Sequence, residues 1–350
     1  MRPRAAGRRL LRGLSVLAVL GIGCEVLVDG ELGSVRCTDK DEGLLGPPSC
    51  PDGAVCEGGT CVAKRALGEP CVEDGDCRPL DFCLELSQLD GEGQTVPTQP
   101  DGEGQSVCAR PCCSSSDCDP RRDAVCWVPP GGGAGVCRVG RDVHRPEVGT
   151  RLAGEACSSP GDCRSGNCSD DVCVDSCCSD THCAANGMTC QLTTGLVSAG
   201  PAWACQPPGQ GAKGPLEECD VHGDCASGIC ADLGDLGFRC TIPCCSSEMC
   251  PSARVGDTVY NVGCALLETG DGATVRACAA LRTGGGFASV GVPCGGDDAC
   301  RSGMCVGGSD DGERSCSDVC CSDASCGDAS RFGCRPYATG PSLALRCAPK

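Results

Sequence analysis

The chain has 350 residues, of which 41 are cysteine and only 2 % are aromatic. Cysteine makes up much of the 40 % of residues counted as hydrophobic, and aromatic side chains normally supply a large share of a core's buried area. This composition argues against barrel and dinucleotide-binding enzymes, and a formal net charge of −18 argues against nucleic acid as a partner.

The first 23 residues have the features of an export signal. Five arginines precede the apolar run LSVLAVLGIG at 14–23, which is too short to span a bilayer. The sequence GIGC at 21–24 resembles the bacterial lipobox, although Gly21 stands where leucine is usual. The resemblance implies a lipid on Cys24, and an odd cysteine count agrees with it, because removing one cysteine leaves an even number to pair. The alternative is a soluble secreted protein in which Cys24 forms a disulfide.

Residues 24–36 are predicted to form a tether, and 37–64 an N-terminal half-repeat with four cysteines. Four full repeats follow, at 65–140, 151–208, 209–280 and 281–350, each with nine cysteines. Every repeat contains an unbroken C-x3-CC-x4-C core. The predicted core disulfide cysteines are Cys112, Cys113, Cys118, Cys177, Cys178, Cys183, Cys244, Cys245, Cys250, Cys320, Cys321 and Cys326.

Three chemical interpretations of these cysteines compete: metal binding, redox catalysis and structural disulfides. Metal and redox sites favour C-x2-C spacing, which the sequence lacks, and its three histidines form no ligand pair. We therefore expect a disulfide framework and no cofactor. The expected fold consists of small disulfide-rich repeats with short β-hairpins and turns, little helix, a helical turn near each CC pair, and no large hydrophobic core.

The cysteine count also limits the connectivity. Nine cysteines cannot all pair within one repeat, so at least one disulfide should link neighbouring repeats. Adjacent cysteines should take different partners, because a ring between them is strained. We expect these links to produce a semi-rigid rod.

Acidic residues recur beside the cysteines. Asp76, Asp162 and Asp224 each precede the second cysteine of a repeat, which is typical of turns capped by aspartate. A weaker alternative is calcium binding, for which the candidates are Asp74, Asp76, Asp310 and Asp311.

The opening segments GEPCVEDGDC and GEACSSPGDCRSGNC resemble cysteine-rich repeats of exported bacterial lipoproteins and, more loosely, Dickkopf N-terminal and EB-type modules. The sequence carries no recognised catalytic motif. These features predict a non-enzymatic lipoprotein at the outer membrane or cell surface with a structural or adhesive role. Its expected partners are the membrane, through the lipid, and a surface protein or polysaccharide. The alternative function is a secreted protease inhibitor that presents disulfide-braced loops.

Overall fold

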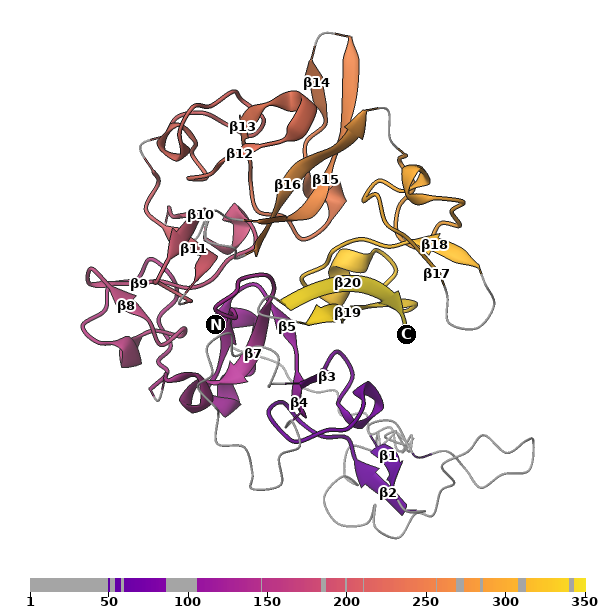
Figure 1. Ribbon diagram of the computed structural model, residues 1–350. Coiled ribbons are helices and arrows are strands. Elements are labelled where there is room, and N and C mark those ends of the chain that lie inside the picture. Colours follow the sequence, from indigo (N-terminus) through magenta and orange to yellow (C-terminus); the bar gives the residue numbers. More distant parts are fainter. Residues whose placement is uncertain are drawn as a thin grey trace, which may run out of the picture. The chain divides into compact units, whose positions relative to one another are not determined.

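The computed structural model describes residues 50, 54–57, 60–85, 106–145, 147–183, 187–198, 200–209, 211–255, 257–268, 274–283, 286–307, 313–339 and 343–350. The chain divides into two units, Met1–Ala63 and Lys64–Lys350. In the described part of the first unit, β1 (Ala54–Glu57) and β2 (Thr60–Ala63) form an antiparallel hairpin (Figure 1), and Cys50 is bonded to Cys61.

The second unit is built from short antiparallel hairpins, as the sequence predicts. Repeat 1 contains the pair β3 (Phe82–Glu85) and β4 (Ser106–Ala109), and the sheet β5 (Pro111–Cys112), β7 (Gly135–Val139), β6 (Ala124–Trp127). Repeat 2 contains β8 (Cys168–Ser169) with β9 (Val172–Cys173), and β10 (Thr189–Thr194) with β11 (Pro201–Gln206). Repeat 3 contains β12 (Cys230–Asp232) with β13 (Phe238–Cys240), and the sheet β14 (Ala253–Val255), β15 (Thr258–Glu268), β16 (Thr274–Thr283). Repeat 4 contains β17 (Cys305–Gly307) with β18 (Arg314–Cys316), and β19 (Phe332–Thr339) with β20 (Leu343–Pro349).

Helix in the described residues is limited to single 3₁₀ turns. One follows each CC pair, which confirms the prediction: η4 (Ser115–Asp117), η8 (Asp180–His182), η12 (Ser247–Met249) and η14 (Asp323–Cys326). A second set lies before the second cysteine of each repeat, and at Asp76, Asp162 and Asp224 the sequence predicts a turn there: η2 (Asp74–Asp76), η7 (Pro160–Asp162), η10 (His222–Asp224) and η13 (Asp297–Ala299). The remaining turns are η5 (Pro120–Arg122), η6 (Gly140–Val143) and η11 (Gly234–Leu236). No helix among the described residues is long and apolar enough to cross a membrane.

Aspartate side chains hold these turns, as the sequence pattern indicates. The Asp162 Oδ2 accepts hydrogen bonds from the backbone N–H groups of Ser158 (2.8 Å) and Ser159 (3.2 Å). These bonds stabilise the carboxylate and lower the pKa of Asp162. Gly166 then adopts a φ of +67°, a conformation that glycine reaches without steric cost.

The disulfides repeat one connectivity. Within each repeat the first cysteine bonds the third, the second bonds the fourth, the fifth bonds the eighth and the seventh bonds the ninth. The sixth bonds its counterpart in the neighbouring repeat, as Cys113–Cys178 and as Cys245–Cys321. Both predictions on connectivity, a link between neighbouring repeats and different partners for adjacent cysteines, are confirmed.

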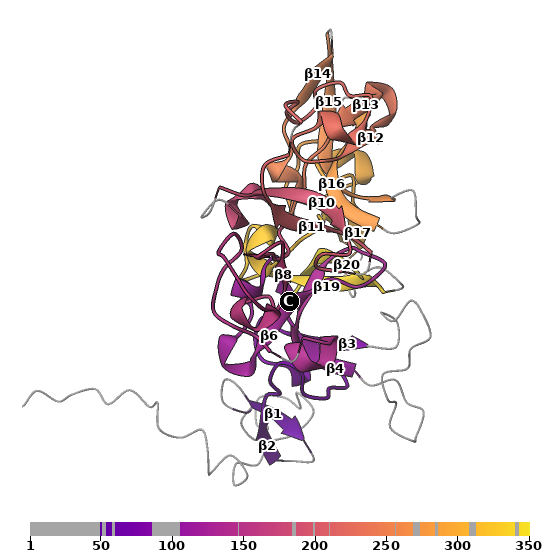
Figure 2. The same ribbon diagram turned by 90° about the vertical axis from the view of Figure 1, so that its left-hand side faces the viewer.

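Apolar residues are distributed over small clusters in which cysteine is prominent, as expected for a fold without a large core. One cluster joins repeats 1 and 4, where the hairpin β19–β20 lies beside β3–β4 (Figure 1 and Figure 2). Its larger members are Phe82, Leu84, Val136, Phe332, Leu343 and Leu345.

The expected semi-rigid rod of successive repeats is wrong. The backbone of Gly133 pairs with Leu343 of repeat 4, and that of Gly132 pairs with Thr274 of repeat 3. Repeat 1 therefore contacts repeats 3 and 4 directly. The reason is that apolar residues of repeat 1, such as Phe82 and Leu84, are covered by Phe332, Leu343 and Leu345 of repeat 4, which is not its neighbour along the chain.

Candidate functional site

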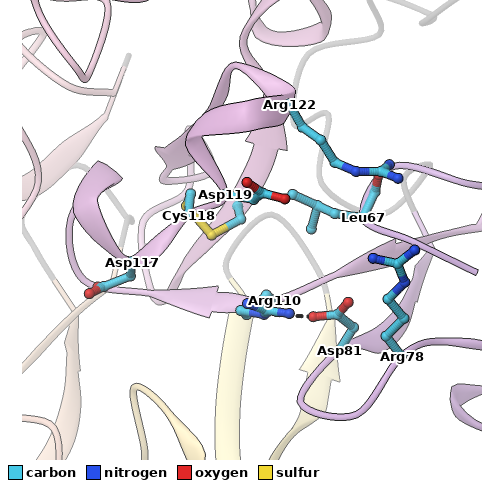
Figure 3. A pocket seen from close by; sticks show the side chains of 9 residues that line it. Leu67, Arg78, Asp81, Arg110, Asp117, Cys118, Asp119 and Arg122 are labelled. Carbon is cyan, nitrogen blue, oxygen red and sulfur yellow. Dashed lines mark hydrogen bonds and ion pairs between the residues drawn. A yellow bond between two sulfur atoms is a disulfide. The ribbon is translucent and has the colours of Figure 1, made fainter. Parts of the chain in front are cut away.

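A polar pocket lies between the two halves of repeat 1 (Figure 3). Its volume is about 260 Å³. It is lined by Leu67, Arg78, Asp81, Arg110, Asp117, Cys118, Asp119, Arg122 and Cys137. Three of these residues are arginines and three are aspartates.

The floor of the pocket is an ion pair that the β3–β4 hairpin positions. Asp81 directly precedes Phe82, and Arg110 directly follows Ala109, which is the register partner of Phe82. The Arg110 Nε therefore donates a hydrogen bond of 2.7 Å to the Asp81 Oδ1 (Figure 3). Burial raises the pKa of Asp81, although the bond to Arg110 acts in the opposite direction.

The other two carboxylates of the pocket wall are engaged by local backbone. The Asp117 Oδ2 accepts hydrogen bonds from the N–H groups of Cys113 (2.8 Å) and Ser114 (3.0 Å). The Asp119 Oδ1 accepts one from Arg121 N–H (2.9 Å), which caps η5. Figure 3 shows the Asp117 carboxylate pointing away from Arg110 and from Arg78.

Two arginines complete the pocket. The Arg122 Nη1 donates to the Leu67 carbonyl at 3.0 Å, and its Nη2 lies 3.9 Å from the exposed carboxylate of Glu69. The Arg78 guanidinium forms no ion pair within the described part of the chain. A guanidinium presents planar paired donors that fit carboxylate and sulfate oxygens. Within this pocket Arg78, which is not in an ion pair among the described residues, is therefore the side chain best suited to hold an anionic group.

The sequence-predicted site residues are distributed through the structure. All twelve repeat-core cysteines lie in disulfides, whereas Cys24, Asp310 and Asp311 are outside the described residues. The Asp76 Oδ2 accepts from the N–H of Glu73, the N-cap of η2, at 3.2 Å and from Val72 N–H at 2.8 Å. The Asp74 Oδ1 accepts from Cys83 N–H at 2.8 Å. These carboxylates thus serve turns, and calcium binding at them stays a prediction.

Sequence reasoning missed two buried aspartates that connect repeats. The Asp175 carboxylate accepts from the Ser115 N–H (2.8 Å) and from the Ser115 hydroxyl (2.9 Å). Asp318 accepts in the same way from Ser247, at 2.7 and 2.9 Å. Burial raises the pKa of each aspartate to about 6, although the donated hydrogen bonds favour the charged form. Each contact joins the same two repeats as one of the inter-repeat disulfides.

A signal for this pairing is present in the sequence. Repeats 1 and 3 read CARPCCSS and CTIPCCSS, whereas repeats 2 and 4 read CVDSCCSD and CSDVCCSD. The alternation places a serine in the odd repeats and its aspartate partner in the even ones. It therefore indicates that an odd repeat pairs with an even one, as repeat 1 does with 2 and repeat 3 with 4.

The arginine residues of the pocket carried no such sequence signal, because Arg78 and Arg110 are separated by a long insertion. No protein-family model matches the chain, and no curated protein or solved structure is significantly similar to it.

Proposed function

We propose that this protein is a non-enzymatic, surface-anchored lipoprotein that acts as a disulfide-braced scaffold and binds an acidic surface polysaccharide. The observation that carries the proposal is the crosslinking: four repeats share one connectivity, and two disulfides join them in pairs. Such a framework keeps its shape outside the cell without a large apolar core. A rigid frame also lowers the entropy lost when a ligand binds.

The anchor in this proposal is a lipid on Cys24. A single short acyl chain holds a protein only weakly, whereas two chains hold it stably. Diacylation of Cys24 would therefore tether the disulfide framework to the outer membrane or cell surface. Intact-mass spectrometry of the protein purified from membranes tests the anchor, because it reports the acyl groups together with the number of bonded cysteines.

The ligand contact in this proposal is the arginine-lined pocket. Arg110 is held in place by the buried Asp81, so its donors are preorganised. Arg78 and Arg122 face the same space (Figure 3). Since the chain as a whole is acidic, a polyanion is not attracted from a distance, and recognition depends on single carboxylate groups that enter the pocket.

Binding of the unlipidated protein to immobilised polygalacturonate, with neutral dextran as a reference polymer, tests this contact. The variants Arg78→Ala and Arg122→Ala should each weaken binding about tenfold, the loss expected for one charge-assisted hydrogen bond. Arg121→Ala is the matched control, because Arg121 lies in η5 and is exposed but does not line the pocket.

Two results would contradict the proposed ligand. One is retention on polygalacturonate that is the same for all three variants. The other is retention of the natural protein on dextran that equals its retention on polygalacturonate. Stoichiometric loss of protease activity on adding the protein would instead support the alternative function as an inhibitor. A protein with free thiols and no acyl group would contradict the proposed anchored scaffold.

A further inference from the structure

One cysteine from each of the four CC pairs meets the others at a single buried centre. Its members are Cys113, Cys178, Cys245 and Cys321, and their sulfur atoms all lie within 4.8 Å of one another. The four residues are between 2 and 7 % exposed. They form two disulfides, yet the non-bonded sulfurs of Cys113 and Cys245 are only 3.6 Å apart.

A buried arginine lies against the other two sulfurs of this four-cysteine centre. Arg276 is on β16 and is 5 % exposed. Its Nη1 donates to the Cys321 Sγ (2.8 Å) and to the Cys320 carbonyl (2.8 Å), and its Nη2 lies 3.5 Å from the Cys178 Sγ. The indole N–H of Trp203 in repeat 2 donates to the Arg276 carbonyl at 2.8 Å and so fixes the strand from the opposite side.

The charge of Arg276 is not balanced. No carboxylate in the described part of the protein forms an ion pair with it, and its Nε has no hydrogen-bond partner there. A buried cation without an anion is costly, because desolvation is not repaid. The groups that face its guanidinium are the Cys320 carbonyl and the sulfurs of Cys178 and Cys321. A sulfur becomes the missing anion when it is released as a thiolate.

We infer that the four-cysteine centre is a thiol–disulfide exchange site, in which reduction of one bond by a small dithiol leaves Cys113–Cys245 bonded and Cys178 and Cys321 free beside Arg276. The geometry separates the sulfurs into two sets. Cys113 and Cys245 are the pair in non-bonded contact, whereas Cys178 and Cys321 are the pair that Arg276 touches.

The exchange proceeds in two steps. In the first, the dithiol breaks the Cys245–Cys321 bond and is itself oxidised to a cyclic disulfide, so that two electrons and two protons pass to the two cysteines. In the second, the Cys245 thiol loses its proton to solvent, its thiolate attacks the Cys113 sulfur, the Cys113–Cys178 bond breaks, and Cys178 leaves as a thiolate. The second step involves no net oxidation, and its leaving thiolate is stabilised by the Arg276 guanidinium.

Reduction of the other bond first leads to the same product. A Cys113 thiolate would attack Cys245, and Cys321 would leave beside Arg276. The crosslinks between repeats 1 and 2 and between repeats 3 and 4 are thereby replaced by one link between repeats 1 and 3. A crevice lined by Cys113, Cys178, Arg276 and Trp203 has about 10 Å³ of free volume, room for no more than one water molecule, so reduction should be slow.

Limited reduction of the full chain with dithiothreitol tests this inference. Samples are quenched with N-ethylmaleimide over a time course, and the state of the four cysteines of the centre is mapped by digestion and mass spectrometry, whichever other disulfides have been reduced. The expected species carries labels on Cys178 and Cys321 and contains a crosslinked peptide pair of Cys113 and Cys245. Labels on Cys245 and Cys321 with Cys113–Cys178 intact would overturn the inference, as would labels on Cys113 and Cys178 with Cys245–Cys321 intact.

The role of Arg276 has a separate test. Arg276→Gln should lower the yield of the Cys113–Cys245 species at pH 7 about tenfold, as expected for loss of a charge-assisted hydrogen bond. Arg301→Gln is the control, because its guanidinium instead donates to the Cys250 carbonyl (3.2 Å). Should Arg276→Gln fail to fold, the pH profile of alkylation in the partially reduced natural protein decides. Cys178 and Cys321 should react with a midpoint well below the ordinary thiol pKa of about 8.5, and an ordinary midpoint would overturn the role of Arg276.

Discussion

Removing one inter-repeat disulfide should cost more stability than removing a disulfide within a repeat. The double substitution Cys113→Ala/Cys178→Ala opens a crosslink between residues 65 positions apart. The chain-entropy relation for disulfides gives about 4 kcal/mol at 25 °C for a loop of that length. Other disulfides shorten the covalent path between the two residues, but the cost depends on the logarithm of loop length, so that the figure changes little.

The matched control is Cys157→Ala/Cys168→Ala, which opens a crosslink of 11 residues within repeat 2. The same relation gives about 3 kcal/mol for this shorter loop. Both variants remove one disulfide and add no charge, and therefore differ mainly in loop length and in whether two repeats are joined.

Guanidinium unfolding with the remaining disulfides intact measures the difference. The fluorescence of Trp127 in repeat 1 and Trp203 in repeat 2 reports on both sides of the removed link. We also expect a steeper denaturant dependence for the inter-repeat variant, because its unfolded chain exposes more surface. A smaller loss of stability than in the control would refute the reasoning that these links constrain the unfolded chain.

Three further outcomes follow from the structure. Gly133→Ala should lower the melting temperature by more than Gly195→Ala. Both glycines have positive φ, but only at Gly133 would an added Cβ meet backbone, 2.2 Å from a carbonyl oxygen. Equal losses would contradict the close contact between repeats 1 and 4. Because the folded-state pKa of Asp175 and of Asp318 is about 6 and the ordinary value is 3.8, their contribution to stability falls as the pH rises from about 4 to 6. The variant Asp175→Asn/Asp318→Asn should lack this decline in its free energy of unfolding, and parallel pH profiles would contradict it. Full reduction should unfold the protein under mild conditions, and a far-UV circular dichroism spectrum unchanged by reductant would disprove the structural role of the disulfides.

Local features of the fold could be predicted because cysteine spacing and turn residues act over short distances. Asp162 and Gly166 have the turn roles that their positions indicate. The odd cysteine count of each repeat predicts a link between neighbouring repeats, and the structure places these links at Cys113–Cys178 and Cys245–Cys321. The arrangement of the repeats could not be predicted in this way. Gly133 pairs with repeat 4 through backbone atoms alone, and such contacts leave no pattern in side-chain chemistry.

The candidate pocket was equally hidden from sequence reasoning. Asp81 and Arg110 form an ion pair across the ends of a hairpin, but 29 positions separate them along the chain. Register, not sequence proximity, brings them together. Arg276 is similarly inconspicuous, since an arginine within a strand usually points to solvent and here is buried against sulfur.

The sixth cysteine of each repeat determines how a protein of this kind can grow or shrink. Because that cysteine finds its partner one repeat away, gain or loss of a single module would leave an orphan thiol ready to dimerise with another molecule. We therefore expect duplication or truncation of this protein to occur in steps of two repeats, because only a linked pair of repeats leaves no unpaired cysteine.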